Sequence, residues 1–190
     1  MTNKTIAIYG GSFNPPTIAH FIIPTCLLAT GIVDNVMVMP SFLHPDGKVL
    51  VDFDLRMSMC DAMFRNEGRV IVSDIEKVLG GLSLSLRTVR YIVDHAPSGT
   101  NYRFVVGTDC YVNRAMWKSD WDAINEMAPF LYMPRPGYKG PPESETTPMF
   151  PDISSTTVRN SLKQGKIPDT LMHKNVAKII VEKGLYEYAV

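Results

Sequence analysis

The sequence has little cysteine and no excess of charge of either sign. Its three cysteines, Cys26, Cys60 and Cys110, lie far apart and form neither a metal-binding spacing nor a disulfide framework, which favours a reducing compartment. Lys and Arg together number 19, as do Asp and Glu, so the net charge is zero. Because a general nucleic-acid binder is usually basic, no nucleic-acid partner is expected. An anionic ligand would have to be held by local cations and helix dipoles.

Long apolar runs are absent as well. No stretch reaches the roughly 20 residues that a membrane span requires, so no membrane partner is expected. The N-terminal apolar run stops at Gly10, before a signal-peptide core could form, and we therefore predict a soluble, cytoplasmic protein. A hydrophobic content of 45% and a charged content of 20% are typical of a globular chain. The 190 residues favour a single domain over 1–190, as a monomer or a homodimer.

Short apolar runs alternate with helical patterns along most of the chain. Strands are predicted at Thr5–Tyr9, Asn35–Met39, Arg69–Ser73, Arg103–Val106 and Pro129–Met133. Helices are predicted at Ile18–Thr30, Phe53–Arg65, Leu84–His95, Trp121–Met127 and Thr170–Glu182, the last with Gly184 as its cap. This alternation predicts an α/β fold of Rossmann-like type, with a mostly parallel sheet, helices on both faces and a small helical C-terminal part.

A proline-rich loop over 134–148 interrupts the alternation. It contains too many prolines for regular structure, and a loop of this length in a compact domain is commonly functional or mobile. Too little chain follows it to build a second domain, so we place the loop within the single domain. There it could close over bound substrates and exclude water.

The turn between the first strand and the first helix, Tyr9–His20, carries the most informative pattern. It places a glycine pair, two prolines, a hydroxyl and a histidine in one connection. Glycines let a backbone come close to a ligand, and a helix N-terminus offers unpaired N–H groups and a positive dipole to phosphate. The turn lacks both the lysine of a Walker A loop and the third glycine of a dinucleotide fingerprint. An ordinary strand-to-helix turn is the alternative for this segment alone.

A second phosphate-binding pattern lies at Ile153–Arg159. Three hydroxyl residues, Ser154, Ser155 and Thr156, open a predicted helix, and Arg159 follows less than two turns later. Free N–H groups, hydroxyls and an arginine together suit a phosphate. The alternative is a hydroxyl-capped helix start followed by a solvent-facing arginine.

Together, these segments resemble the nucleotidyltransferase superfamily, which carries a (His/Thr)-x-Gly-His turn after its first strand and an Ile-Ser-Ser-Thr-x-x-Arg motif near its end. The matching residues here are Thr17–His20 and Ile153–Arg159. Further matches resemble one branch, the nicotinate/nicotinamide mononucleotide adenylyltransferases. They are Gly10–Pro16, Val106–Asp109, Trp117, Arg135–Tyr138 and Gly184–Tyr186. The resemblance runs in order over nearly the whole chain.

The resemblance implies transfer of the adenylyl group of ATP to a pyridine mononucleotide in NAD synthesis, with release of pyrophosphate. Positioning and charge neutralisation dominate such phosphoryl chemistry. The residues implied to be catalytic are His20, Thr17 and Arg159, and Mg²⁺ is implied to accompany ATP without a protein metal site. The implied ATP-binding residues are Gly10, Gly11, Ser12, Phe13, Thr17, His20, Ile153, Ser154, Ser155, Thr156 and Arg159.

The resemblance also implies a mononucleotide site. Its expected residues are Ser12, Phe13, Lys48, Ser85, Asp109, Trp117 and Arg135. Trp117 would stack on the pyridine ring, although by residue type alone it could be a core residue, as we expect for Trp121. Asp109 would accept hydrogen bonds from ribose hydroxyls, with a helix N-cap as its alternative role. Arg56 is a candidate for a structural ion pair at a helix start.

Two residues depart from the pattern of the branch. Thr17 replaces its usual histidine, and Ala19 replaces a glycine that lets the nucleotide approach the helix start. Two alternative functions therefore stay open: adenylyl transfer to another acceptor, such as phosphopantetheine or FMN, and non-catalytic nucleotide binding. The residues do not distinguish a nicotinate from a nicotinamide acceptor.

Overall fold

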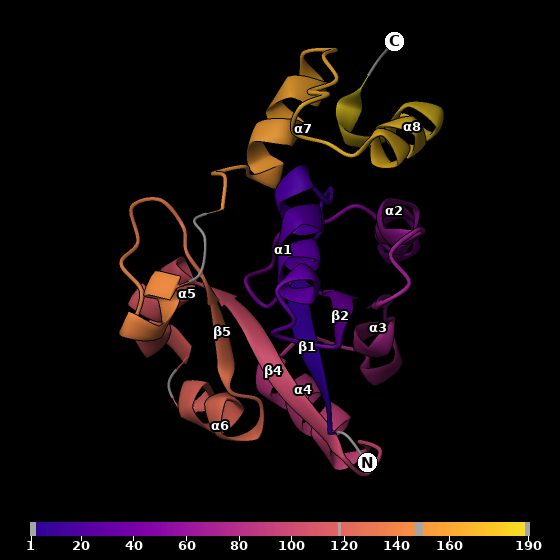
Figure 1. Cartoon of the computed structure of the whole chain (residues 1–190). Helices are drawn as coiled ribbons and strands as arrows, with labels where there is room; N and C mark the ends of the chain where they lie inside the picture. The colour runs from indigo at the N-terminus through magenta and orange to yellow at the C-terminus, as the bar shows by residue number, and fades with distance from the viewer. Residues whose placement is uncertain (1–2, 118, 147–149, 189–190) are drawn as a thin grey trace.

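The computed structural model describes residues 3–117, 119–146 and 150–188. Five strands form one parallel sheet in the order β3-β2-β1-β4-β5 (Figure 1). Their bounds are β1 Lys4–Gly11, β2 Asn35–Pro40, β3 Val70–Val72, β4 Thr100–Gly107 and β5 Phe130–Met133. All five predicted strands and the parallel sheet are confirmed.

The longer helices also follow the sequence pattern. They are α1 Ile18–Ala29, α2 Phe53–Phe64, α4 Ser85–Asp94, α6 Asp120–Met127, α7 Ser155–Lys163 and α8 Lys174–Lys183. Helix α8 begins later than predicted because the ring of His173 caps it and accepts the N–H of Asn175. Several short elements were not predicted, because one or two turns carry no readable apolar period. They are α3 Ile75–Leu79, α5 Thr108–Val112, and the 3₁₀ helices η1 Arg114–Trp117, η2 Pro142–Thr146 and η3 Leu185–Glu187.

Helices cover both faces of the sheet, as the burial of its strands requires. Successive residues of a strand point to opposite faces, so Ala7 and Tyr9 belong to one apolar core and Ile8 belongs to the other. The first core includes residues of α1, α2, α7 and α8, and the second includes residues of α4 and α6. The predicted two-sided α/β architecture is therefore confirmed.

The helical C-terminal part is attached to the start of α1. Figure 1 shows α7, α8 and the C-terminus at the end of the molecule opposite the N-terminus. The N–H of Ile18 donates to the carbonyl of Leu171 at 2.9 Å. Val158, Leu162, Val176 and Ile180 are buried in the first core. The C-terminal helices thus complete the environment of the first strand-to-helix turn.

The proline-rich loop is more ordered than the sequence suggested. Within its described part, 134–146, Arg135 forms an isolated bridge with Tyr138, and η2 follows. Pro142 is the first residue of η2, where a missing N–H costs no hydrogen bond. The expectation that this segment lacks regular structure was therefore wrong for η2. Positions 147 and 148 of the predicted loop lie outside the described residues.

Four strands end at the same edge of the sheet. The register pairs Gly11 with Pro40 and Gly107 with Met133. Strands β2 and β3 lie on one side of β1, and β4 and β5 lie on the other. The strand order therefore reverses beside β1, and open parallel sheets bind ligands at such a switch point. The first turn and the segments with Lys48, Asp109 and Arg135 all follow these strand ends.

Candidate functional site

The first turn is open beside Gly10 and filled beside Gly11. A methyl group at Gly10 would meet no atom within 4 Å, whereas one at Gly11 would lie 3.2 Å from the ring of Phe13. Phe13 is buried, and its ring centroid lies 4.9 Å from that of His20. Ser12, between Gly11 and Phe13 in the sequence, is half buried. The turn therefore offers a ligand its backbone at Gly10 and uses Phe13 to support the imidazole.

Thr17 determines which ring nitrogen of His20 carries the proton. The N–H of Thr17 donates to Nδ1 at 3.0 Å, and the Thr17 hydroxyl lies 2.7 Å from the same atom. Because a backbone N–H can only donate, Nδ1 is an acceptor and the neutral ring carries its proton on Nε2. Thr17 is fully buried as the N-cap of α1. Thr17, which replaces the histidine usual in the branch, thus orients the imidazole.

His20 is neutral at physiological pH. Burial, with a smaller contribution from the positive charge of Arg135, lowers the pKa of its imidazole to about 4. A neutral ring with Nδ1 occupied keeps one strong donor, the Nε2–H. His20 can therefore donate a hydrogen bond to a phosphate oxygen without bringing a formal charge.

The start of α7 packs directly on the first turn. The Ser155 hydroxyl donates to the carbonyl of Pro15 at 2.8 Å. Arg159 Nη1 donates to the carbonyl of Asn14 at 2.7 Å. The two predicted phosphate-binding segments, separated by about 140 residues of sequence, are therefore in direct contact. The alternative in which Arg159 only faces solvent is wrong.

The other residues of the second segment form the N-terminus of α7. Ser154 is the N-cap, and its hydroxyl accepts the N–H of Thr157 at 3.1 Å. Thr156 accepts a hydrogen bond from Arg159 Nη2 at 3.0 Å. Ile153 is half buried just before the cap. The helix start therefore presents free N–H groups and hydroxyls next to the guanidinium, as an anion site requires.

Asp109 and Arg135 form an ion pair above the end of β4. Arg135 Nε lies 3.3 Å from Asp109 Oδ1, and the Arg135 N–H donates to the Thr108 hydroxyl at 2.9 Å. A methyl group at Gly107 would collide with Asp109 Oδ1 and lie 2.9 Å from Arg135 Nε, so the pair needs glycine there. Gly107 is the N-cap of α5 and Asp109 lies in its first turn, so the N-cap role for Asp109 is wrong.

Trp117 lies at the boundary between the core and the surface. It ends η1, is half buried, and meets Trp121 edge-on with ring centroids 5.6 Å apart. Trp121 is buried, as predicted. Trp117 therefore is not a fully buried core residue, and part of the residue is accessible.

Lys48 lies on the loop after β2, and Ser85 follows the loop that connects α3 to α4. Lys48 is exposed, its Nζ lies 3.4 Å from His44 Nε2, and it lines a cavity of about 240 Å³. Ser85 is half buried as the first residue of α4. The hydroxyl that joins the two loops belongs to Ser83, which accepts the N–H of Phe42 at 2.7 Å. The structure thus brings Ser83, not Ser85, into contact with the β2 loop.

Arg56 connects this cavity to the first turn. It is 1% exposed and donates to the carbonyls of Val51, Ser12 and Phe42 at 2.8, 2.9 and 3.4 Å. Burial lowers the pKa of its guanidinium. The expected ion pair of Arg56 is wrong within the described part of the chain, because backbone carbonyls of three segments take its donors instead.

Sequence reasoning did not assign roles to Asn14 and Tyr186. The side-chain oxygen of Asn14 accepts the Tyr186 hydroxyl at 2.9 Å and the N–H of Val51 at 3.2 Å. Both residues lie within segments that carry the family resemblance, but nothing in the spacing shows that segments 172 residues apart meet.

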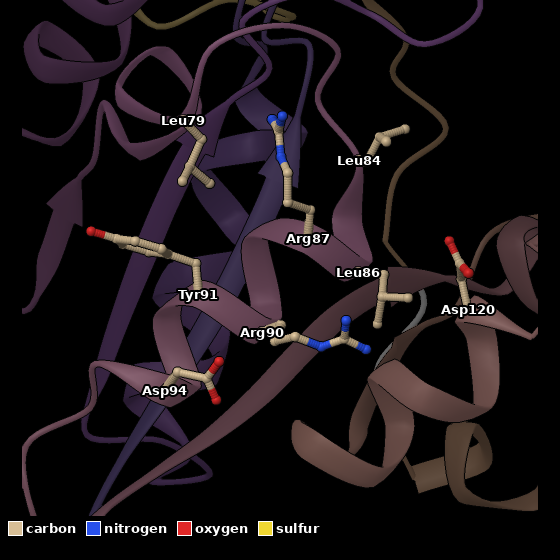
Figure 2. Close-up of a pocket in the computed structure, with 8 residues that line it drawn as sticks. All are labelled: Leu79, Leu84, Leu86, Arg87, Arg90, Tyr91, Asp94 and Asp120. Atoms are coloured by element: carbon tan, nitrogen blue, oxygen red, sulfur yellow. The ribbon is translucent and has the colours of Figure 1, made fainter.

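A second, larger cavity lies away from these residues. It has a volume of about 390 Å³ and lies along the outer side of α4. Figure 2 shows its lining, with Arg87, Arg90, Tyr91 and Asp94 on α4 and Asp120 at the start of α6. None of the predicted site residues lines this cavity. It is therefore not part of the candidate site.

In the part of the chain that the structure describes, no three His, Cys, Asp or Glu side chains group closely enough to hold a metal ion. Among the helices in residues 3–117, 119–146 and 150–188, none has the length and apolarity to cross a membrane.

Comparisons with known proteins agree with the motifs. Residues 8–161 match the cytidylyltransferase-like family. The chain is 36% identical over 185 residues to a protein of Anaeromyxobacter dehalogenans named "Probable nicotinate-nucleotide adenylyltransferase", covering 96% of this chain and 97% of the relative. It is 33% identical over 182 residues to a protein of the same name from Myxococcus xanthus, covering 95% and 94%.

A solved structure shares the fold. The nicotinic acid mononucleotide adenylyltransferase of Plasmodium falciparum, complexed with NaAD, superposes with a TM-score of 0.82 at 21% identity, covering 98% of both chains. At that identity, the likeness supports the α/β fold alone. The family match and the two bacterial relatives extend over the segments that form the site. The chain therefore belongs to the cytidylyltransferase-like family, in the branch of the nicotinate-nucleotide adenylyltransferases.

Proposed function

We propose that this chain is an adenylyltransferase that joins ATP and nicotinate mononucleotide into the dinucleotide in NAD biosynthesis. The observation that carries this proposal is the direct contact between the two phosphate-binding segments, through Arg159 and the Asn14 carbonyl. The names of the bacterial relatives support the nicotinate form of the acceptor. An oxygen of the mononucleotide phosphate attacks the α-phosphorus of ATP, and the bond to the β-phosphate oxygen breaks to release pyrophosphate.

The triphosphate binds between the first turn and the start of α7. His20 donates its Nε2–H to the phosphoryl group that is transferred, and Thr17 holds the ring in the required tautomer. Arg159 and the hydroxyls of Ser154, Ser155 and Thr156 hold the outer phosphates. The remaining ATP contacts come from Gly10, Gly11, Ser12, Phe13 and Ile153. Preorganised donors of this kind stabilise the transition state because they need no rearrangement when charge develops.

The mononucleotide binds beside the ends of β2 and β4. Trp117 stacks on the pyridine ring with its accessible face, and Asp109 binds the ribose hydroxyls while paired with Arg135. Lys48 attracts the mononucleotide phosphate from its exposed loop, and Ser85 contacts the pyridine substituent. Ser12 and Phe13 contribute from the first turn, between the two substrates.

Mg²⁺ accompanies ATP in this proposal. The described residues include no cluster of three metal-ligating side chains. Such a site suits a metal that is coordinated mainly by the phosphates and water. When bound, Mg²⁺ neutralises charge on the phosphates of ATP. The three free cysteines suit the reducing cytoplasm, where the enzyme would act as a monomer or a homodimer.

An acceptor panel tests this function. Purified protein with Mg²⁺-ATP is assayed for pyrophosphate release with nicotinate mononucleotide, nicotinamide mononucleotide, phosphopantetheine or FMN. We expect dinucleotide formation with the pyridine mononucleotides and the highest kcat/KM with the nicotinate form. Turnover with phosphopantetheine or FMN, and none with either pyridine mononucleotide, would overturn the assignment of the acceptor. If calorimetry shows ATP binding but no acceptor supports pyrophosphate release, the protein is a non-catalytic relative and the proposed enzymatic function is wrong.

A further inference from the structure

Asn14 lies within the first turn, at the centre of a hydrogen-bond network. It is 5% exposed. Its side-chain oxygen accepts two hydrogen bonds, from the Tyr186 hydroxyl at 2.9 Å and from the N–H of Val51 at 3.2 Å. Its backbone carbonyl accepts the Nη1 donor of Arg159 at 2.7 Å. The orientation of Asn14 therefore determines the position of the carbonyl that holds the guanidinium.

Tyr186 reaches this network from the C-terminal segment. It lies in η3, and both Tyr186 and Glu187 have a φ of 59°, in the left-handed region that non-glycine residues seldom adopt. Lys163, the last residue of α7, pairs with Glu187 at 2.8 Å. Unfavourable backbone conformations persist only where surrounding contacts maintain them. The contacts of these two residues include the exposed Lys163 ion pair at Glu187, and the Asn14 hydrogen bond and core packing at Tyr186.

We propose that Tyr186 is a positioning residue for the triphosphate site, acting through Asn14 on Arg159. The hydroxyl donates to the Asn14 side chain, and the Asn14 carbonyl in turn anchors Arg159 Nη1. Tyr186 itself touches no reacting atom. The inference rests on the proposed function for the identity of the ligand, since Arg159 is the residue that holds the ATP phosphates.

The surroundings keep the Tyr186 hydroxyl protonated. Burial raises the pKa of its phenol, while the nearby guanidinium groups of Arg56 and Arg159 oppose that shift and the buried Cys60 adds to it. Arg56 holds the neighbouring carbonyl of Ser12. The protonated hydroxyl remains a donor to Asn14 throughout the range in which an enzyme would be assayed.

Tyr186→Phe is the direct test, because it removes the hydroxyl and keeps the ring that packs against the core. Loss of one neutral hydrogen bond corresponds to about a fivefold change in an equilibrium. We expect the ATP KM and the Mg²⁺-ATP dissociation constant to rise about fivefold, with the mononucleotide KM within twofold of wild type. Tyr188→Phe is the matched control, since Tyr188 packs against the same core and its hydroxyl bonds to no residue among those described. The control should leave all three constants unchanged.

A double-mutant cycle separates positioning from a general loss of stability. In an Asn14→Ala background the acceptor is gone, so adding Tyr186→Phe should change the ATP KM by less than twofold. In an Asn14→Asp background an acceptor remains, so Tyr186→Phe should again raise the ATP KM about fivefold. If adding Tyr186→Phe to Asn14→Ala still raised the ATP KM about fivefold, the proposal would be overturned, because the hydroxyl would then act by another route than Asn14. So would an unchanged ATP KM in Tyr186→Phe itself.

Two measurements distinguish this proposal from the proposed function. Dinucleotide formation by the wild-type protein tests the function. Calorimetric titration with Mg²⁺-ATP alone, without an acceptor, tests the positioning role in the same variants. If wild type forms no dinucleotide but Tyr186→Phe still weakens Mg²⁺-ATP binding about fivefold, the function fails and the positioning role holds. If wild type is active and Tyr186→Phe binds Mg²⁺-ATP as tightly as wild type, the positioning role fails alone.

Discussion

Replacing Thr17 by valine should slow adenylyl transfer without unfolding the protein. Valine has nearly the shape of threonine and fits the same fully buried site, but it lacks the hydroxyl that lies 2.7 Å from His20 Nδ1. The N–H of Thr17, at 3.0 Å from the same atom, is unaffected by the change. The perturbation therefore removes one of two donors that share a single lone pair.

The size of the effect follows from this sharing. A neutral hydrogen bond contributes about 1 kcal/mol net, with a range of roughly 0.5–1.5 kcal/mol. Because the backbone N–H still satisfies Nδ1, no buried acceptor is left without a partner, and the loss belongs in the lower half of that range. We expect kcat/KM for ATP to fall about two- to fivefold, since 1.4 kcal/mol corresponds to a factor of about ten.

Steady-state kinetics and ¹⁵N NMR of the imidazole together test this reasoning. Thr17→Ser keeps the hydroxyl and should retain wild-type kinetics within twofold. In the wild type at pH 7, the His20 ring should appear neutral with its proton on Nε2. A ring protonated on Nδ1, or a Thr17→Val enzyme that is folded and fully active, would refute the assignment. Equal losses in Thr17→Ser and Thr17→Val would refute it as well, because the hydroxyl would then not be the cause.

Three further predictions have defined outcomes. His20→Ala should lower kcat on the order of 10²-fold, as loss of a transition-state donor does. Circular dichroism checks that the variant is folded, and intact activity would contradict the prediction. Gly107→Ala should displace Asp109 and Arg135 and raise the mononucleotide KM more than the ATP KM. Gly10→Ala, whose methyl group would meet no protein atom within 4 Å, should raise the ATP KM more than the mononucleotide KM. Because the folded-state pKa of His20 is lowered from 6.5 to about 4, its contribution to stability is present above pH 6.5 and is lost as the pH falls toward 4. Wild type should therefore lose up to about 3 kcal/mol more unfolding free energy than His20→Gln over this range, measured by urea denaturation at each pH, and equal losses would contradict the lowered pKa.

The sequence by itself determined the architecture and located the two predicted phosphate-binding segments. The apolar runs around Ile8, Val36 and Val105 predicted their strands because burial on both faces demands β-branched and apolar side chains. Turn glycines and hydroxyl caps marked the loop before α1 and the start of α7, since their chemistry is local to a few residues. The short helix α5 and the 3₁₀ helices escaped prediction, because they are too short to show a period.

Only the tertiary structure decided which donors meet which acceptors. The Ser83 hydroxyl joins the β2 loop in place of Ser85, and Arg56 binds three carbonyls instead of a carboxylate. The contact of Tyr186 with Asn14 crosses 172 residues and has no signature in the spacing of either segment. A hydrogen bond requires a donor–acceptor distance that is correct to within a few tenths of an ångström, and folding sets that distance. Residue type and spacing determine which groups are available, and the packed chain determines which of them pair.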